Sequence, residues 1–184
     1  LSIRRQRQMC IRDRFICIYK LGLILTPGEV LSWSNRIRSL TSTRHRNILL
    51  RVAHGDVFSN SRLCRFGLIN DPKCSNCPEP SESIFHRIVE CPKANRAWLE
   101  LEEVKLKLDL PQLSDLSIEN LIGAKEKVTK IALALQAELL HKLTSIGSKD
   151  YCPKQLVKSA VKVICCCENL SSDLKEKFKE INSS

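Results

Sequence analysis

Three cysteines and one histidine lie close together near the middle of this 184-residue chain. Cys74 and Cys77 are followed by His86 and Cys91, which gives the spacing Cys-x2-Cys-x8-His-x4-Cys. Zinc favours four thiolate or imidazole ligands at the corners of a tetrahedron. A Cys-x-x-Cys turn presents two sulfurs to one ion, and a second element must then supply the other two donors. We therefore expect these four side chains to hold one structural Zn²⁺ with no open coordination position.

An alternative interpretation is that the three cysteines are buried free thiols. A Cys-x-x-Cys pair alone occurs by chance and in redox turns, but the addition of His86 and Cys91 favours the metal. In that case metal binding contributes much of the folding free energy of the surrounding subdomain. Three thiolates around a divalent cation leave one negative charge, which Lys73, Arg87 and Lys93 could offset.

The elements that must position the ligands are expected to be helices. Ser42 or Thr43 can cap a helix that runs to His54, and Gly55 can end it. A second short helix is expected over residues 59–65. A third should begin at Ser81 or Ser83 and carry His86, and a fourth over residues 94–107 places Trp98 on its apolar face.

The remainder of the chain also has helical periodicity. Residues 111–117 form a linker, and residues 124–146 are predicted to form the longest helix. Pro153 can open another helix, and Asp173 with Glu176 forms a capping box before a last one. The predicted fold class is therefore mostly α, with a small Cys3His zinc-binding helical domain followed by a C-terminal helical bundle.

Four segments follow from this pattern. Residues 1–14 resemble the conceptual translation of a sequencing-library adapter, and we expect them not to be native. Residues 15–40, which include a strand-like run over 16–25, are expected to be a remnant of an upstream region or a linker. Residues 41–107 form the zinc-binding domain, and residues 108–184 form the helical tail.

Positive charge is concentrated ahead of the cysteine motif. The chain carries a net charge of +10, and residues 36–65 hold seven arginines against one acid. Such a surface can neutralise phosphates with little reading of sequence. The alternatives are a solvated face or a docking face for another domain. Trp98 could stack on a base, but its spacing favours the core. The candidate phosphate contacts are Arg36, Arg38, Arg44, Arg46, Arg51, Arg62 and Arg65.

The remaining cysteines and histidines receive plainer interpretations. Ten cysteines without a disulfide-like spacing favour a reducing compartment, so we expect an intracellular location, cytoplasmic or nuclear. Cys64 is expected to be buried. The run Cys165-Cys166-Cys167 is read as small core residues, although metal binding or pairing between chains is an alternative. The other histidines are expected at the surface or in caps: His45, His54 and His141.

The order of the motifs resembles the zinc-binding region of reverse transcriptases from non-LTR retrotransposons, over about residues 36–107. In that family the region follows the polymerase near the C-terminus of the long reading frame. The motifs that carry the resemblance are RHRNILLRVAHGD at 44–56, RLCRFG at 62–67, Cys74-x2-Cys77, Glu82, His86, Cys91-Pro92 and Trp98.

The resemblance implies a module that helps an RNA-directed DNA polymerase hold template RNA or target DNA. No Tyr-x-Asp-Asp-like run is present, so we expect no catalysis by this chain alone and no small-molecule substrate. No apolar run reaches the length of a membrane span, so we expect no membrane. The alternative function is a zinc-stapled helical interaction module that docks the upstream polymerase or another protein. A decayed copy without function is a third interpretation.

Overall fold

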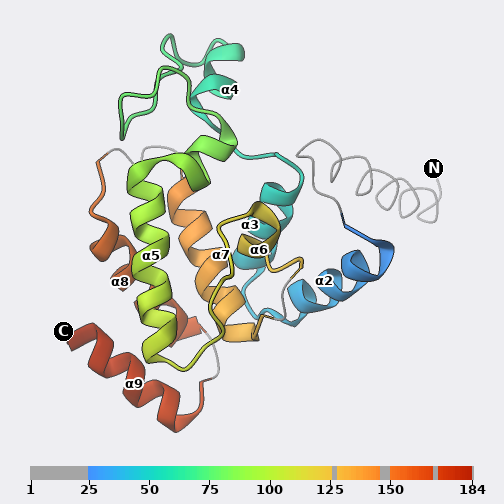
Figure 1. Cartoon of the computed structure of the whole chain (residues 1–184), viewed down its shortest axis with the longest axis vertical. Helices are drawn as coiled ribbons and strands as arrows, with labels where there is room; N and C mark the ends of the chain where they lie inside the picture. Colours follow the sequence, from blue (N-terminus) through green and yellow to red (C-terminus); the bar gives the residue numbers. More distant parts are fainter. Residues whose placement is uncertain (1–24, 126–127, 146–149, 168–169, 184) are drawn as a thin grey trace.

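The computed structural model describes residues 25–125, 128–145, 150–167 and 170–183. Every regular element within these ranges is a helix, as predicted (Figure 1). The residues expected to derive from an adapter, and nearly all of the strand-like run, lie outside the described ranges. The elements are α2 (Pro27–Ser39), α3 (Thr43–Ala53), α4 (Asn60–Arg65), η1 (His86–Glu90), α5 (Pro92–Lys107), α6 (Ile118–Leu121), α7 (Lys130–Thr144), α8 (Pro153–Cys167) and α9 (Ser172–Ser183).

Side-chain caps begin most of these helices, and several were predicted. The Ser42 hydroxyl accepts a hydrogen bond from the His45 amide at the start of α3, and Ser59 caps α4 in the same way. A hydroxyl at this position satisfies one of the amides that a helix N-terminus leaves without a partner. The predicted capping box at Asp173 is wrong, because the Ser171 hydroxyl accepts from the Leu174 amide.

Helix α7 lies at the centre of the molecule, in contact with α3, α5 and α8 (Figure 1). Most of its side chains are buried, and they are mainly alanine and leucine. Trp98 on α5 is fully buried, and its indole Nε1 donates to the Ile88 carbonyl at 2.8 Å. Its predicted position in the core is confirmed.

The described part of the segment expected to be a remnant or a linker packs into this core. Trp33 on α2 is buried, and its Nε1 donates to the Ile122 carbonyl at 2.9 Å. Ile37 and Leu40 belong to the same buried cluster as Trp98 and Phe178. One core therefore includes residues from α2, from the predicted zinc-binding domain and from the predicted tail.

The helix predicted over residues 124–146 is shorter than expected. It begins at Lys130, with Thr129 as its cap, and its 15 residues are fewer than the 16 of α5. The short helix α6 precedes it and ends near Gly123, whose φ is +69°. A Cβ atom there would lie 2.8 Å from Leu133 Cδ1, so the turn requires glycine for both its dihedral angle and its space.

Candidate metal centre

Cys74 and Cys77 lie in a loop that backbone hydrogen bonds close. The Cys74 amide donates to the Glu79 carbonyl at 3.0 Å. The Asn76 amide points back at the Cys74 sulfur at 3.4 Å, which is the arrangement that stabilises a thiolate. We refer to residues 71–91, which contain all four predicted ligands, as the metal segment.

His86 and Cys91 are placed by a π-helical turn that sequence reasoning missed. In an α-helix, residues five apart lie roughly 140° apart around the axis, so their side chains diverge. Here η1 has the wider π geometry, and the Cys91 amide donates to the His86 carbonyl at 2.8 Å. An i to i+5 hydrogen bond brings these two residues nearly into line. The His-x4-Cys spacing and the π turn therefore belong together.

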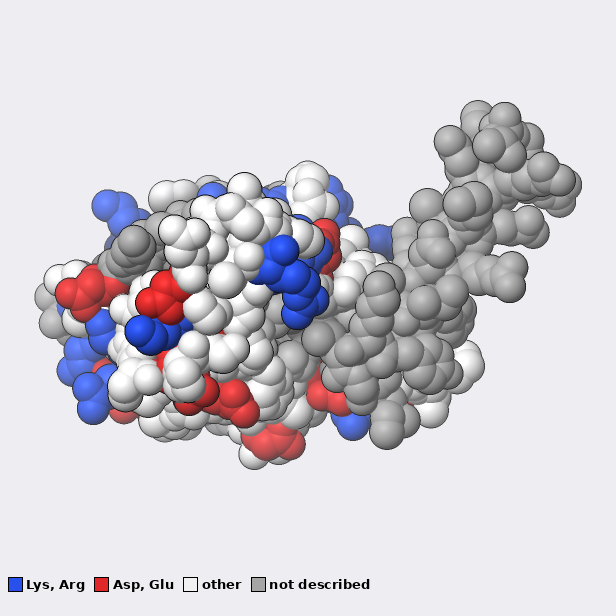
Figure 2. All heavy atoms as spheres, turned by 90° about the horizontal axis from the view of Figure 1, so that it is seen from above, with Lys and Arg blue, Asp and Glu red and all other residues white. Residues whose placement is uncertain are grey.

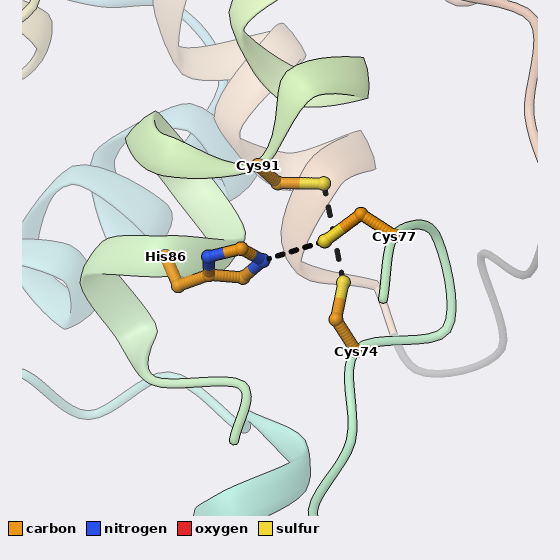
Figure 3. A group of neighbouring side chains, drawn as sticks. All are labelled: Cys74, Cys77, His86 and Cys91. Atoms are coloured by element: carbon orange, nitrogen blue, oxygen red, sulfur yellow. Dashed lines mark hydrogen bonds between the residues drawn. The ribbon is translucent and has the colours of Figure 1, made fainter. Parts of the chain in front are cut away.

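The structure brings the four predicted ligands together (Figure 3). Their donor atoms all lie within 4.8 Å of one another. Cys74 Sγ is 3.9 Å from Cys91 Sγ, and Cys77 Sγ is 3.2 Å from His86 Nε2. Sulfurs at about 2.3 Å from a tetrahedral ion are about 3.8 Å apart, so this donor set fits one metal ion.

Three of the four donors are buried, and the fourth lies at the edge of a cavity. Cys74, His86 and Cys91 are each less than a tenth exposed, whereas Cys77 is partly exposed. Burial raises the pKa of the Cys74 thiol to about 12, so at neutral pH a metal must displace its proton. A cavity of about 560 Å³ opens beside Cys77 and His86, and Glu79 and Glu90 also line it.

The cations expected to offset the charge of the centre have carboxylate partners of their own. Lys73 pairs with Asp71 at 3.4 Å, and Lys93 pairs with Asp150 at 2.6 Å. On the other side of the ligands, Glu90 Oε2 lies 3.9 Å from His86 Nδ1. A carboxylate near the free nitrogen of a ligating histidine helps to orient its ring.

A buried ion pair joins the metal segment to the end of α7. Glu82 is 2% exposed, and its Oε1 accepts from Arg87 Nη1 and from the Asn60 amide, both at 3.0 Å. Arg87 also donates to three backbone carbonyls: those of Phe58, Leu143 and Ser145. The last two belong to the C-terminus of α7, where a cation is favourable. In the sequence, Glu82 is marked only by the resemblance. In the structure, its buried ion pair with Arg87 gives it a role in holding the metal segment in place.

The seven candidate arginines divide into two groups. Arg38 and Arg65 are exposed and have no side-chain partner among the described residues. The other five contact the protein. Their partners are the Ala124 carbonyl for Arg36, Glu138 for Arg44, the Thr43 hydroxyl for Arg46, the Asp56 carbonyl for Arg51, and the Asp56 carboxylate for Arg62.

On the face that carries α4, positive charge is divided into separate groups (Figure 2). Figure 2 views the end of the molecule that carries α4, and there lysines and arginines stand in separate groups among uncharged surface and acids. Arg44 pairs with the buried Glu138, but its own side chain is about half exposed. It can therefore still be reached by an anion from solvent. Arg38 and Arg65 differ from the other five in being exposed without a side-chain partner among the described residues.

The expectation that His45 lies at the surface is wrong. His45 is fully buried on α3, and its Nε2 is 2.9 Å from Glu138 Oε2 on α7. Burial alone would raise the pKa of Glu138, but the hydrogen bond from His45 and the charges of Arg44 and Lys142 hold that pKa below its ordinary value. The network joins α3 to α7, and sequence spacing gave no sign of it because its members lie more than 90 residues apart.

The cysteines outside the cluster that were predicted to be buried are more exposed than expected. Cys166 and Cys167 are exposed at the end of α8, so the interpretation of these two as core residues is wrong. Cys165 and Cys64 are intermediate rather than buried. Among the described residues, the metal segment contains the one cluster of donors arranged for a metal ion.

Residues 22–98 match the family model described as zinc-binding in reverse transcriptase. The match includes all four clustered donors, Glu82 and Trp98. This part of the chain is therefore a reverse transcriptase zinc-binding region, which is distinct from the catalytic polymerase region. No curated protein and no solved structure shows significant similarity to the chain.

Two coarser statements follow from the site and the match. The clustered donors and the matched family together indicate a bound metal ion. Within the part of the chain that the structure describes, no helix is long and apolar enough to cross a membrane.

Proposed function

We propose that this chain is the zinc-stabilised nucleic-acid-binding part of a non-LTR retrotransposon reverse transcriptase, an RNA-directed DNA polymerase that acts inside the cell. In this proposal Cys74, Cys77, His86 and Cys91 hold one structural Zn²⁺. The proposal is supported above all by the assembly of these four donors inside the matched region. A closed Cys3His set is typical of structural zinc rather than of catalytic zinc, which keeps an open position.

Basic side chains around the metal segment would contact the phosphates of template RNA or target DNA. Arg38 and Arg65 are the best candidates, because both are exposed and neither is held by a side-chain partner among the described residues. Arg44, Arg46, Arg51 and Arg62 add positive charge from fixed positions. Contacts of this kind give affinity that falls steeply with salt and varies little with sequence.

The test is the affinity of the full chain for a fluorescent 20-nucleotide single-stranded RNA, measured by anisotropy across a salt series. Reversing Arg38 and Arg65 together to glutamate should weaken binding. It should also reduce the slope of log K against log salt by about 1.4, the value for two phosphate contacts with a single strand.

The matched control reverses Lys175 and Lys179, two exposed lysines on α9, and thus makes the same change in net charge. The arginine variant should lose clearly more affinity than the lysine variant. Equal losses would mean that only net charge matters, and binding that is indifferent to salt would refute the proposed function.

A second candidate function is docking of another protein, such as the upstream polymerase. One observation favours it: Leu99 and Leu106 on α5 are more than half exposed and lie seven residues apart, on one face of the helix. Replacing both with glutamate should leave RNA affinity nearly unchanged if this face serves a protein instead. A loss of RNA affinity larger than that of the arginine variant would argue against this division of roles.

A further inference from the structure

Arginines and phenylalanines alternate in a stack that begins on α3 and ends just after α4. The Arg62 guanidinium carbon lies 5.7 Å from the centroid of the Phe58 ring and 5.6 Å from that of the Phe66 ring. Arg51 lies 5.7 Å from the Phe58 ring. These distances are within the range of cation–π attraction. We call these four residues the Arg–Phe ladder.

Hydrogen bonds fix the ladder in place. Arg62 Nη1 donates to the Gly55 carbonyl at 2.9 Å, and its Nη2 donates to Asp56 Oδ1 at 2.8 Å. Arg51 Nε donates to the Asp56 carbonyl at 2.9 Å. Side chains that are already ordered lose less conformational entropy when a ligand binds. The ladder is therefore organised before any ligand arrives.

Two residues of the metal segment hold the backbone around the ladder by hydrogen bonds. The Phe58 carbonyl accepts from Arg87 at 3.0 Å, and Arg87 is paired with the buried Glu82. The Asn60 amide at the start of α4 donates to Glu82 as well. The ladder and the metal centre are thus joined through one ion pair.

The last member of the ladder is open to solvent. Phe66 is 55% exposed, although Arg62 lies over its ring. Leu68 follows at 67% exposure, and Gly67 between them has a φ of +69°, which turns the chain. Arg65 is exposed beside them and has no side-chain partner among the described residues. An aromatic ring, an apolar neighbour and a free cation therefore lie together.

The combination selects the chemistry of the ligand. A ligand for this surface must offer a flat apolar face and a negative charge within one side-chain length of each other. An unpaired nucleotide has both, since its base can stack on an aromatic ring while its phosphate meets a cation. The bases of a duplex are stacked on one another and expose no such face.

We propose that Phe66 stacks on an unpaired base of single-stranded nucleic acid, with Arg65 at the adjacent phosphate. The proposal rests on the proposed nucleic-acid-binding function and adds a preference for single strands. In this proposal the base stacks on the Phe66 ring and so adds one more flat group to the series of arginines and rings. The positive ladder beneath it makes an anionic nucleotide a better occupant than a neutral or basic protein surface.

The experiment compares full-length variants against a 20-nucleotide oligouridine and a blunt 20-base-pair RNA duplex across the same salt series. Phe66→Leu keeps an apolar side chain and removes the ring. It should weaken single-strand binding about five- to tenfold, the low end of the range for one stacked base, because leucine keeps part of the apolar contact. The salt slope should stay unchanged because no phosphate contact is lost. Duplex affinity should also stay unchanged.

Two further variants complete the design. Phe66→Trp should restore single-strand affinity, and the fluorescence of the new indole should be quenched when oligouridine binds. Leu31→Ala truncates an exposed leucine on α2, outside the ladder and its neighbours, and should change affinity less than twofold. Circular dichroism and zinc content verify that each variant is folded.

The other outcomes overturn the proposal in distinguishable ways. If Phe66→Leu weakens neither nucleic acid, or weakens both equally, stacking is wrong while phosphate binding by the arginines stands. If the wild-type chain binds neither with salt-sensitive affinity, the proposed function fails as well. If the wild type sediments as a dimer and Phe66→Leu as a monomer, a second copy of the chain occupies this surface.

Discussion

The metal segment and helix α7 are held in place by different interactions. Ile88 is the one buried apolar residue of the metal segment that is not a predicted ligand, and the other buried side chains there are polar or ligands. Helix α7 buries 11 of its 15 residues, mostly alanine and leucine. Burial of apolar area stabilises α7 by about 25 cal/mol per Å². The metal segment has less of that source of stability, with Ile84 and Val89 only partly buried, so its order depends more on the ion and on the Glu82–Arg87 pair.

This difference explains why two kinds of sequence signal lie side by side in one chain. Periodic apolar residues mark a helix that the hydrophobic effect can fold. The metal segment instead carries four donors at fixed spacing and three prolines, and its apolar residues are confined to positions 84–89. Each part should therefore respond to a different perturbation.

Removing the metal should have the largest effect, and the effect should be local. Cys77→Ser replaces the most exposed donor and should abolish metal binding, whose apparent free energy in small zinc domains is about 10–16 kcal/mol. Hydrogen exchange should then accelerate in residues 71–91, while the amides of α7 stay protected. Cys166→Ser, which changes an exposed cysteine outside the cluster, is the control and should alter neither metal content nor exchange. Loss of protection throughout α7 would contradict the separation.

Trp98→Ala should instead destabilise the whole molecule. The side chain is fully buried, and truncating a buried tryptophan costs about 3–5 kcal/mol. Urea unfolding should show a lower midpoint for the loss of helical signal. Leu99→Ala, one residue further along and 57% exposed, should change the midpoint little. A midpoint that is unchanged in Trp98→Ala would show that α5 does not belong to the common core.

Glu82→Gln should loosen the connection between the two regions. The variant keeps an acceptor for Arg87 but removes the charge, and a hydrogen bond to a charged group contributes about 1.5–3 kcal/mol. The metal should be lost faster to a chelator, while the urea midpoint of the helical core changes little. Glu79→Gln, at an exposed carboxylate of the same segment, serves as the control. Equal rates of metal loss in the two variants would argue against the connection.

Glu138→Gln should make a smaller, pH-dependent change to the core. The folded pKa of Glu138 lies below its ordinary value of 4.5, so the ionised side chain stabilises the fold above that pH. This contribution is lost as the pH falls through the lower folded pKa. The variant should therefore be about 1–3 kcal/mol less stable than the wild type at pH 7, and the difference should shrink below pH 4.5. A difference that is constant from pH 7 to pH 3 would contradict the network around His45.

The sequence predicted the local features of the fold well. The cap at Ser42 and the donor spacing act over a few residues, so a single chain reveals them. The composition of the core was also visible, since Trp98 follows the apolar spacing of its helix. The packing of α2 was not predicted, because the partner of Trp33 is the Ile122 carbonyl, 89 residues away.

The four donors of the metal centre were predicted, but the structural features around them were not. The π turn was not predicted, although His86 and Cys91 are five positions apart, a separation at which side chains on an α-helix diverge. The Arg–Phe ladder was not predicted, because the positive charge of an arginine does not indicate which aromatic ring its side chain contacts. Arg62 and Phe66 are four residues apart, a separation at which helical neighbours meet, and that spacing was the available signal.

X-ray absorption at the zinc edge of the purified chain tests the central claim most directly. We predict one zinc per chain, with three sulfur neighbours at about 2.3 Å and one nitrogen neighbour at about 2.0–2.1 Å. Cys77→Ser should remove this signature, and Cys166→Ser should leave it unchanged. A metal segment that stays ordered without zinc, or a zinc surrounded mainly by oxygen, would contradict the account.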